Sequence, residues 1–206
     1  MTRPIRLAAL ISGGGTTLQN FIDRIVSGEM SAEIAVVISS SATACGLQRA
    51  KAAGIPSAVV ERKRGQSVEE FSEANFDVIR KYAPNLVCLA GYLKLLRIPD
   101  DYAGRVMNIH PALIPAFCGH GYYGHAVHEA AIDYGVKVSG CTVHFVNNEY
   151  DAGPIIIQRT VPVLENDTAD VLAARVFREE CIAYPLAIRL FQTGRLKVVG
   201  RKVVIA

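Results

Sequence analysis

Several features that would mark a specialised class of protein are missing from this 206-residue sequence. Its five cysteines are odd in number, widely spaced and never arranged as Cys-x-x-Cys, so we predict neither a zinc ribbon nor a disulfide framework. We interpret them as free thiols of a reducing, cytoplasmic compartment. No apolar run approaches the ~18 residues of a membrane span, and the run at residues 5–11 is too short for a signal peptide.

The sequence also lacks a strong excess of either positive or negative charge. The formal net charge is +3, and the Lys and Arg residues are spread along the chain, with one dense group at residues 61–64. A nucleic-acid-binding protein would need a concentrated basic face, so we predict small-molecule substrates and no nucleic-acid or membrane partner. Half of the residues are hydrophobic, which is enough for one globular domain over residues 1–206, as a monomer or homodimer.

The order of the predicted elements indicates an α/β protein. Residues 5–11 form a continuous apolar run, which is typical of a strand buried on both faces of a parallel sheet. Strands and helices then alternate, which predicts a single doubly wound, mostly parallel sheet with antiparallel strands near the C-terminus. Further strands are predicted at residues 34–39, 57–60, 85–90, 106–110, 138–146 and 155–161, a hairpin at 196–205, and helices at 18–25, 42–53, 68–82, 125–135 and 168–191.

The stretch 106–111 holds the strongest candidate site. Side chains alternate along a strand, so Asn108 and His110 face the same way, and Pro111 ends the strand. Ligands of open α/β sheets bind at the carboxyl ends of strands. Asp151 lies in a loop between two later strands, where its carboxylate can be directed at a site. The alternative is a buried strand whose polar side chains satisfy local backbone groups.

A glycine turn follows the first predicted strand and opens a helix. Gly13, Gly14 and Gly15 allow close approach of an anion, while Thr16 and Thr17 add hydroxyl donors. The turn lacks the Gly-Lys-Ser/Thr of a P-loop and the third glycine of a dinucleotide fingerprint. We therefore favour a phosphate monoester as its ligand; a turn that serves only close packing is the alternative.

Other potentially reactive residues give weaker signals. His120, His125 and His128 are not completed by a carboxylate or cysteine pattern, so we predict no metal. Cys118 and Cys141 have no base assigned to them by the sequence. His144 is interpreted as structural, and the glycine- and tyrosine-rich loop at 117–124 as a candidate lid.

Five motifs taken together resemble the phosphoribosylglycinamide formyltransferases, the folate-dependent enzymes of purine synthesis. The resemblance extends over essentially the whole chain, with a phosphate-binding half at about 1–105 and a folate-binding, catalytic half at about 106–206. The motifs are Ile-Ser-Gly-Gly-Gly-Thr-Thr-Leu-Gln at 11–19, Leu-Ala-Gly-Tyr-Leu-Lys-Leu-Leu at 89–96, Met-Asn-Ile-His-Pro-Ala-Leu-Ile-Pro at 107–115, Thr-Val-His-Phe-Val at 142–146 and Asp-Ala-Gly-Pro-Ile-Ile-Ile-Gln at 151–158.

The resemblance implies a role for each matching position. Asn108, His110 and Asp151 correspond to the catalytic residues, and 10-formyltetrahydrofolate is implied as the formyl donor, without a metal. Lys94 stands where arginine is common, which alters any contact made through that side chain. The acceptor, phosphoribosylglycinamide, is assigned to Gly13, Gly14, Gly15, Thr16, Thr17 and Glu180, and the folate to Leu93, Lys94, Leu95, Leu96, Asn108, Asn147, Asn148, Glu149, Tyr150 and Asp151.

The implied chemistry is direct acyl transfer to an amine. Asn108 and a protonated His110 are expected to stabilise the oxyanion, while Asp151 raises the pKa of His110 and assists proton transfer. Three alternatives remain at this point: a formyltetrahydrofolate hydrolase, a methionyl-tRNA formyltransferase, and a nucleotide-binding module without catalysis. The first two usually carry an extra domain that this sequence lacks.

Overall fold

The computed structural model describes residues 3–206, which form two compact units. One unit runs to Met107 and the other begins at Asn108. Strand β5 (Val106–His110) crosses this boundary, so its first two residues belong to the first unit and its last three to the second.

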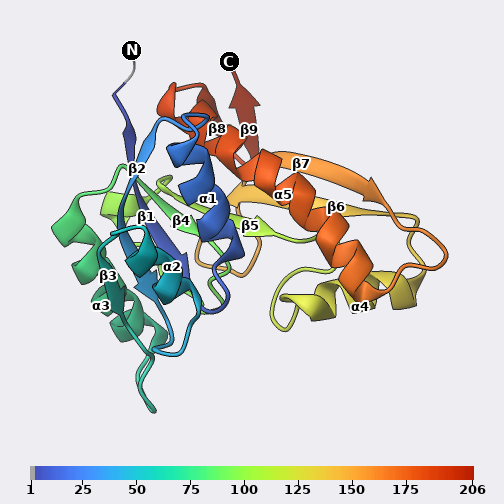
Figure 1. Cartoon of the computed structure of the whole chain (residues 1–206), viewed down its shortest axis with the longest axis horizontal. Helices are drawn as coiled ribbons and strands as arrows, with labels where there is room; N and C mark the ends of the chain where they lie inside the picture. The colour runs from blue at the N-terminus through green and yellow to red at the C-terminus, as the bar shows by residue number, and fades with distance from the viewer. Residues whose placement is uncertain (1–2) are drawn as a thin grey trace. The chain divides into compact units, whose positions relative to one another are not determined.

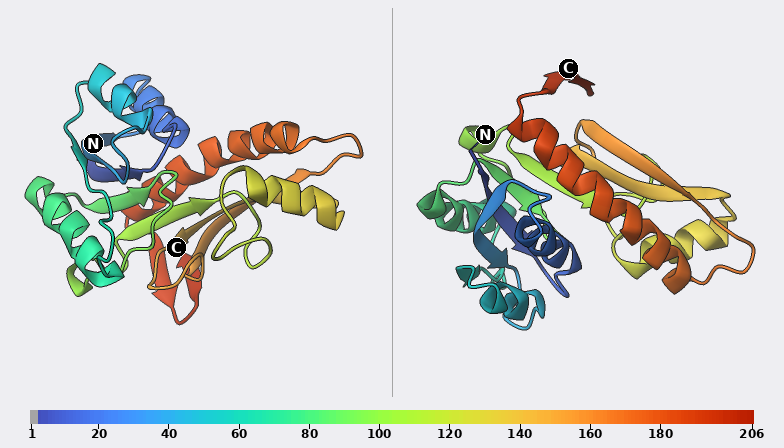
Figure 2. Two further views of the ribbon diagram at one scale, coloured as in Figure 1. Left: turned by 90° about the horizontal axis from the view of Figure 1, so that it is seen from below. Right: turned by 45° about the horizontal axis from the view of Figure 1, so that its top comes forward.

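The first unit is a parallel sheet with helices on both faces. Its strands lie in the order β3-β2-β1-β4, and every paired neighbour is parallel. Helices α1 and α2 cover one face and α3 covers the other (Figure 2). The elements are β1 (Ile5–Ile11), α1 (Thr16–Val26), β2 (Ala32–Ser39), α2 (Gly46–Ala52), β3 (Ser57–Val59), α3 (Val68–Tyr82), β4 (Leu86–Leu89) and a short 3₁₀ helix (Asp100–Tyr102).

Local sequence explains most of these elements. Residues 7–11 of β1 are fully buried, as the continuous apolar run predicts. Helix α3 begins at the predicted residue because Ser67 and Glu70 form a capping box, and it buries Phe71, Phe76 and Ile79. Helix α2 begins at Gly46 instead of residue 42, because residues 41–45 form a turn in which the backbone N–H of Ala44 donates to the Ser41 carbonyl.

The second unit joins antiparallel strands to one long helix. Strands β6 (Val138–Phe145) and β7 (Ile155–Pro162) are antiparallel, and β8 (Leu196–Val199) and β9 (Lys202–Ile205) form the predicted hairpin, in which β9 pairs with β7. Helix α5 (Ala169–Gln192) packs along β6 and β7, and α4 (His125–Tyr134) packs against α5 (Figure 1).

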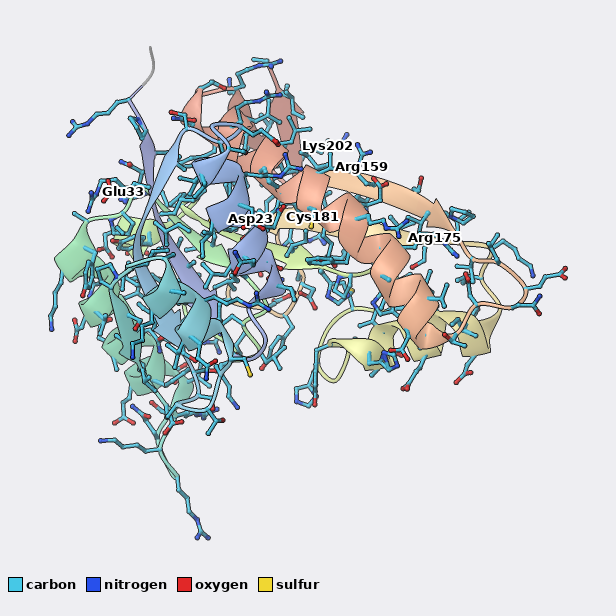
Figure 3. The ribbon with its side chains drawn as sticks, in the orientation of Figure 1. Asp23, Glu33, Arg159, Arg175, Cys181 and Lys202 are labelled. Atoms are coloured by element: carbon cyan, nitrogen blue, oxygen red, sulfur yellow. The ribbon has the colours of Figure 1, made fainter. Side chains whose placement is uncertain are left out.

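Ion pairs fix α5 in this position. Arg159 of β7 pairs with Glu179, and Arg175 pairs with Asp167 at 2.6 Å, just before the helix begins. Figure 3 labels both arginines, Arg159 beside α5 and Arg175 on it. The side chain of Thr168 caps the N-terminus of the helix by accepting from the Val171 N–H. Within residues 3–206, no helix combines the length and the apolar character needed to cross a bilayer.

His128 is an unusual feature of α4. Its side chain is buried, and its Nδ1 atom has no hydrogen-bond partner among residues 3–206. Burial, helped by the nearby imidazoles of His125 and His110, lowers the pKa of His128 to about 4. The folded chain therefore holds this ring neutral at pH values where the unfolded chain protonates it.

We expect His128 to make the second unit sensitive to acid. Its stabilising effect is complete above about pH 6.5 and is lost as the pH falls toward 4, because only the unfolded state takes up the proton in that range. Linkage predicts a loss of about 2 kcal/mol in the free energy of unfolding between pH 7.5 and pH 5. Urea unfolding of the wild type and of His128→Leu at the two pH values measures this loss.

His128→Leu should lose this part of the pH dependence, whereas His120→Gln, which changes a histidine that packs against Tyr150, should keep it. An unchanged pH dependence in His128→Leu would contradict the assignment.

Candidate active site

Three predicted residues meet at the end of β5. Asn108 and His110 lie on the same face of the strand, and both contact the carboxylate of Asp151. Asn108 Nδ2 lies 3.2 Å from Asp151 Oδ1, and His110 Nδ1 lies 3.5 Å from Asp151 Oδ2. The His110 side chain is only 4% exposed and that of Asp151 11%. The structure thus gathers an amide, an imidazole and a carboxylate in a site largely removed from water.

The backbone between β6 and β7 directs Asp151 into this site. Asp151 has φ 50°, a left-handed conformation that Asp tolerates better than most residues. Two residues later, Gly153 packs so tightly that a Cβ atom there would lie 1.7 Å from the Phe145 carbonyl oxygen. The N–H of Phe145 also donates to the Pro154 carbonyl at 2.9 Å. These contacts hold the loop against the end of β6 and place the carboxylate.

A backbone carbonyl determines which nitrogen of His110 carries the proton. His110 Nε2 lies 2.8 Å from the Phe117 carbonyl oxygen, which can only accept a hydrogen bond. Nε2 must therefore donate, and in the neutral ring Nδ1 is unprotonated. Because Nδ1 is the nitrogen that faces Asp151, the site presents a proton-accepting nitrogen beside a carboxylate.

The pKa of His110 shifts in the opposite direction to the one predicted. Burial lowers it below its usual value, and this effect outweighs the opposing influences of the Asp151 charge and the Phe117 hydrogen bond. Asp151 does raise it, as predicted, but the expected protonated state of His110 was wrong, because the sequence does not reveal how completely the ring is removed from water. His110 is therefore neutral near pH 7.

Asp151 remains ionised in the same surroundings. Burial alone would raise the pKa of its carboxyl, but interactions with His144, His110 and the backbone N–H of Gly119 outweigh burial and lower it. The Gly119 N–H donates to Oδ2 at 3.0 Å. Sequence reasoning missed Gly119 and the Phe117 carbonyl, because backbone groups of a loop have no residue-type signal.

His144 also reaches the site, although the sequence favoured a structural over a catalytic role for it. Its Nδ1 donates to the Phe145 carbonyl at 2.8 Å, and its Nε2 lies 3.2 Å from Asn108 Nδ2. Nε2 also lies 3.6 Å from Asp151 Oδ1. The amide of Asn108 is thereby oriented by an imidazole on one side and a carboxylate on the other. One signal for this was available in the sequence: Thr142 and His144 are two residues apart on a predicted strand, so their side chains share a face.

The cysteines and the other histidines considered in the sequence do not form a second reactive site in the described part of the chain. Burial and the Asp151 charge raise the pKa of the Cys118 thiol, and burial raises that of Cys141 to about 12, so neither is a ready nucleophile. Within residues 3–206, no group of three or more His, Cys, Asp or Glu side chains is placed to hold a metal ion. Each candidate histidine has its own surroundings: His120 packs edge-on against Tyr150, His125 faces Asp170 and Glu129, and His128 is buried.

The first unit contains the predicted glycine loop. Gly15 adopts the left-handed φ of 70° and directly precedes α1, so the loop ends at free N–H groups of a helix N-terminus. Residues 93–96, predicted to contact the folate, follow β4 without regular structure. The Leu93 N–H donates to Ser12 Oγ at 2.8 Å, which ties this segment to the start of the glycine loop.

The second unit contains the other predicted binding residues. Glu180 is half-buried on α5, and burial raises the pKa of its carboxyl to about 7. In the loop after β6, the Glu149 N–H donates to Asn147 Oδ1, while Asn148, Glu149 and Tyr150 are exposed. The exposed side chains are accessible to a ligand.

Comparison with known proteins gives a consistent picture. A family model described as formyl transferase matches residues 5–188. The phosphoribosylglycinamide formyltransferase of Haemophilus influenzae is 43% identical over 195 residues, which are 94% of this chain and 90% of that protein. Glycinamide ribonucleotide transformylase 1 from Symbiobacterium toebii has a TM-score of 0.91 at 45% identity and covers 100% of this chain and 95% of its own.

A protein named for a different reaction has the same fold. A formyltetrahydrofolate deformylase from Pseudomonas syringae has a TM-score of 0.87 at 27% identity, covering 98% of this chain and 66% of its own. The similarity to the S. toebii structure over the whole chain confirms the predicted α/β fold, with its mostly parallel sheet and its antiparallel strands near the C-terminus.

The opposing effects on His110 can be separated by experiment. Asp151→Asn removes the charge that favours the protonated ring, so the pKa of His110 should fall further. An NMR titration of the His110 ring measures the change. Asp170→Asn, which removes a carboxylate facing His125, should leave His110 unaffected. A His110 pKa that stays constant or rises in Asp151→Asn would show that the carboxylate does not act on this ring.

Proposed function

Because the chain belongs to the formyl transferase family, we propose that it transfers the formyl group of 10-formyltetrahydrofolate to the amine of 5′-phosphoribosylglycinamide in de novo purine synthesis. The observation that carries this proposal is the cluster of Asn108, His110 and Asp151, whose donor and acceptor groups match the needs of acyl transfer. The names of the H. influenzae and S. toebii relatives support the same substrates.

The amine nitrogen of the acceptor attacks the formyl carbon, and the bond from that carbon to the folate nitrogen then breaks. The attacking amine must lose a proton, and the leaving folate nitrogen must gain one. We propose that His110 Nδ1, which is unprotonated in the neutral ring, accepts the proton that the amine loses. Asp151, 3.5 Å away, stabilises the imidazolium that forms, and the proton then passes to the folate nitrogen directly or through water.

Negative charge develops on the formyl oxygen during the attack. The Asn108 amide is the donor during the attack itself, and once His110 Nδ1 has taken the amine proton, the new Nδ1–H donates to the oxyanion of the tetrahedral intermediate. In the structure the amide hydrogens are directed at His144 and Asp151 over 3.2 Å, distances long enough for one to be exchanged for the oxyanion. Donors in comparable acyl-transfer sites contribute about 2.7–4 kcal/mol each to stabilising the transition state.

The binding roles are part of the same proposal. The glycine loop of the first unit, Gly13 to Thr17, holds the acceptor's phosphate at a helix N-terminus. Glu180 contacts the acceptor, and its half-buried carboxyl suits a hydroxyl or amine donor. Residues 93–96 and 147–151 contact the folate, which acts as a co-substrate. No metal is required by this scheme.

We further propose a cytoplasmic location and a monomer or homodimer. The five cysteines form no disulfide within residues 3–206, which suits a reducing compartment.

Hydrolysis of the same folate is the second candidate, and the similarity to the P. syringae deformylase favours it. Water would then replace the amine as nucleophile, with His110 in the same role. The glycine loop at the start of α1 argues for the ribonucleotide, because water needs no phosphate site.

An absorbance assay of folate release separates these candidates. The purified protein receives 10-formyltetrahydrofolate with and without phosphoribosylglycinamide. Release that depends on the ribonucleotide is the expected result. Release at the same rate without it identifies a hydrolase, and no release under either condition rejects both reactions.

His110→Ala should reduce kcat by about 10²–10³-fold, because it removes both a proton acceptor and an oxyanion donor. The Kd for the folate should change much less, since the ring acts mainly in the transition state. Steady-state kinetics and a folate titration measure the two effects. His125→Ala, on an exposed ring of α4, is the matched control and should retain wild-type turnover. If His110→Ala weakened folate binding by the same factor as it lowered kcat, the proposed role of His110 in the transition state would be excluded.

A further inference from the structure

Helix α2 contacts the glycine loop through two hydrogen bonds to consecutive peptide groups. The backbone N–H of Gly46 donates to the Gly13 carbonyl at 3.0 Å. One turn further along α2, Arg49 Nε donates to the Gly14 carbonyl at 2.8 Å. Both carbonyls of the loop that precede Gly15 are therefore fixed by a second helix, which the sequence motif does not include.

These two bonds orient the N–H groups of the loop. In a trans peptide the N–H points opposite to the carbonyl of the same unit. Holding the carbonyls of Gly13 and Gly14 toward α2 therefore turns the N–H groups of Gly14 and Gly15 away from it. Neither N–H has a hydrogen-bond partner in the described part of the chain, and both precede the free N–H groups of the first turn of α1.

The two segments are also in direct backbone contact. A Cβ atom at Gly15 would lie 2.7 Å from the Gly46 Cα, and one at Gly46 would lie 2.5 Å from the Ile11 side chain. Glycine is required at position 15, because a Cβ there would meet the backbone of α2, whereas a Cβ at Gly46 would meet the end of a flexible side chain. Because Arg49 lies three residues after Gly46, it is on the same face of α2 and reaches the loop.

The charge of Arg49 is not neutralised by the protein. Arg6 and Arg24 of the same unit pair with Glu33 and Glu29 at 2.7 Å each. In contrast, Arg49 has no carboxylate partner among residues 3–206, and its second contact is to the neutral Gln19 Oε1 at 3.1 Å. A guanidinium held against an anion-binding loop without a counter-charge leaves net positive charge at that loop.

We propose that Arg49 is a positioning residue of the phosphate site: it fixes the Gly14–Gly15 peptide in its anion-binding orientation and supplies positive charge for a phosphate monoester. This inference rests on the proposed function only for the identity of the ligand. It assigns a role to α2, outside the glycine motif. A purely structural role, in which Arg49 only packs α2 against α1, is the alternative.

The test compares two acceptors that differ only in the phosphate. Wild type, Arg49→Ala and Arg49→Lys are assayed with phosphoribosylglycinamide and with its dephosphorylated nucleoside. Arg49→Ala should raise the KM for the ribonucleotide about tenfold or more with kcat nearly unchanged, because the loop N–H groups lose their fixed orientation and the phosphate site loses a positive charge. kcat/KM for the nucleoside should stay at the wild-type value. Arg49→Lys keeps the charge but loses the forked donor, so its KM should be intermediate.

Arg24→Ala, at the other end of α1, is the matched control for loss of one positive charge and should leave both acceptors unaffected. Equal losses of kcat/KM for ribonucleotide and nucleoside, or no loss for either, would overturn the proposal. If Arg49→Ala fails to fold, the same comparison is made with Arg49→Lys.

Calorimetric titration with inorganic phosphate separates this inference from the reaction itself. Wild type that binds phosphate, with at least tenfold weaker binding in Arg49→Ala, supports the role of Arg49 even if formyl transfer is not observed. Equal phosphate affinity in the two proteins overturns it, whichever reaction the enzyme performs.

Discussion

The candidate site depends on one carboxylate that several groups share. Asp151 accepts from the Gly119 backbone and from the Asn108 amide, and it faces the imidazoles of His110 and His144. A carboxylate so largely buried is costly unless such partners satisfy it. The left-handed backbone at Asp151 and the tight packing of Gly153 hold it where all of them meet. Displacing the carboxylate would therefore disturb every proposed catalytic group at once.

The Phe117 carbonyl complements this arrangement by controlling a proton. It forces Nε2 of His110 to donate, which leaves Nδ1 available on the side of Asp151. Burial keeps the ring neutral, and the carboxylate stabilises the charge once a proton arrives. The two effects oppose each other in the free enzyme, yet together they suit a base that must become an acid within one reaction. The loop at 117–119 is thus part of the chemical site as well as a candidate lid.

The sequence was most informative where local rules decide the outcome. The apolar run of β1, the capping box of α3 and the alternation along β5 predicted their elements and the shared face of Asn108 and His110. It was least informative where distant segments meet. The contact of His144 with Asn108, the donors from residues 117–119 and the reversed pKa shift of His110 all depend on tertiary burial. The late start of α2 reflects a turn that competes with helix formation.

The placement of the His110 proton is the central physical claim, and ¹⁵N NMR of the selectively labelled histidine tests it most directly. The chemical shifts of the two ring nitrogens report which of them carries hydrogen in the free enzyme near pH 7. The structure predicts a neutral ring with a protonated Nε2 and an unprotonated Nδ1. A neutral ring protonated at Nδ1, or a doubly protonated ring, would contradict the role given to the Phe117 carbonyl and to His110 as the initial proton acceptor.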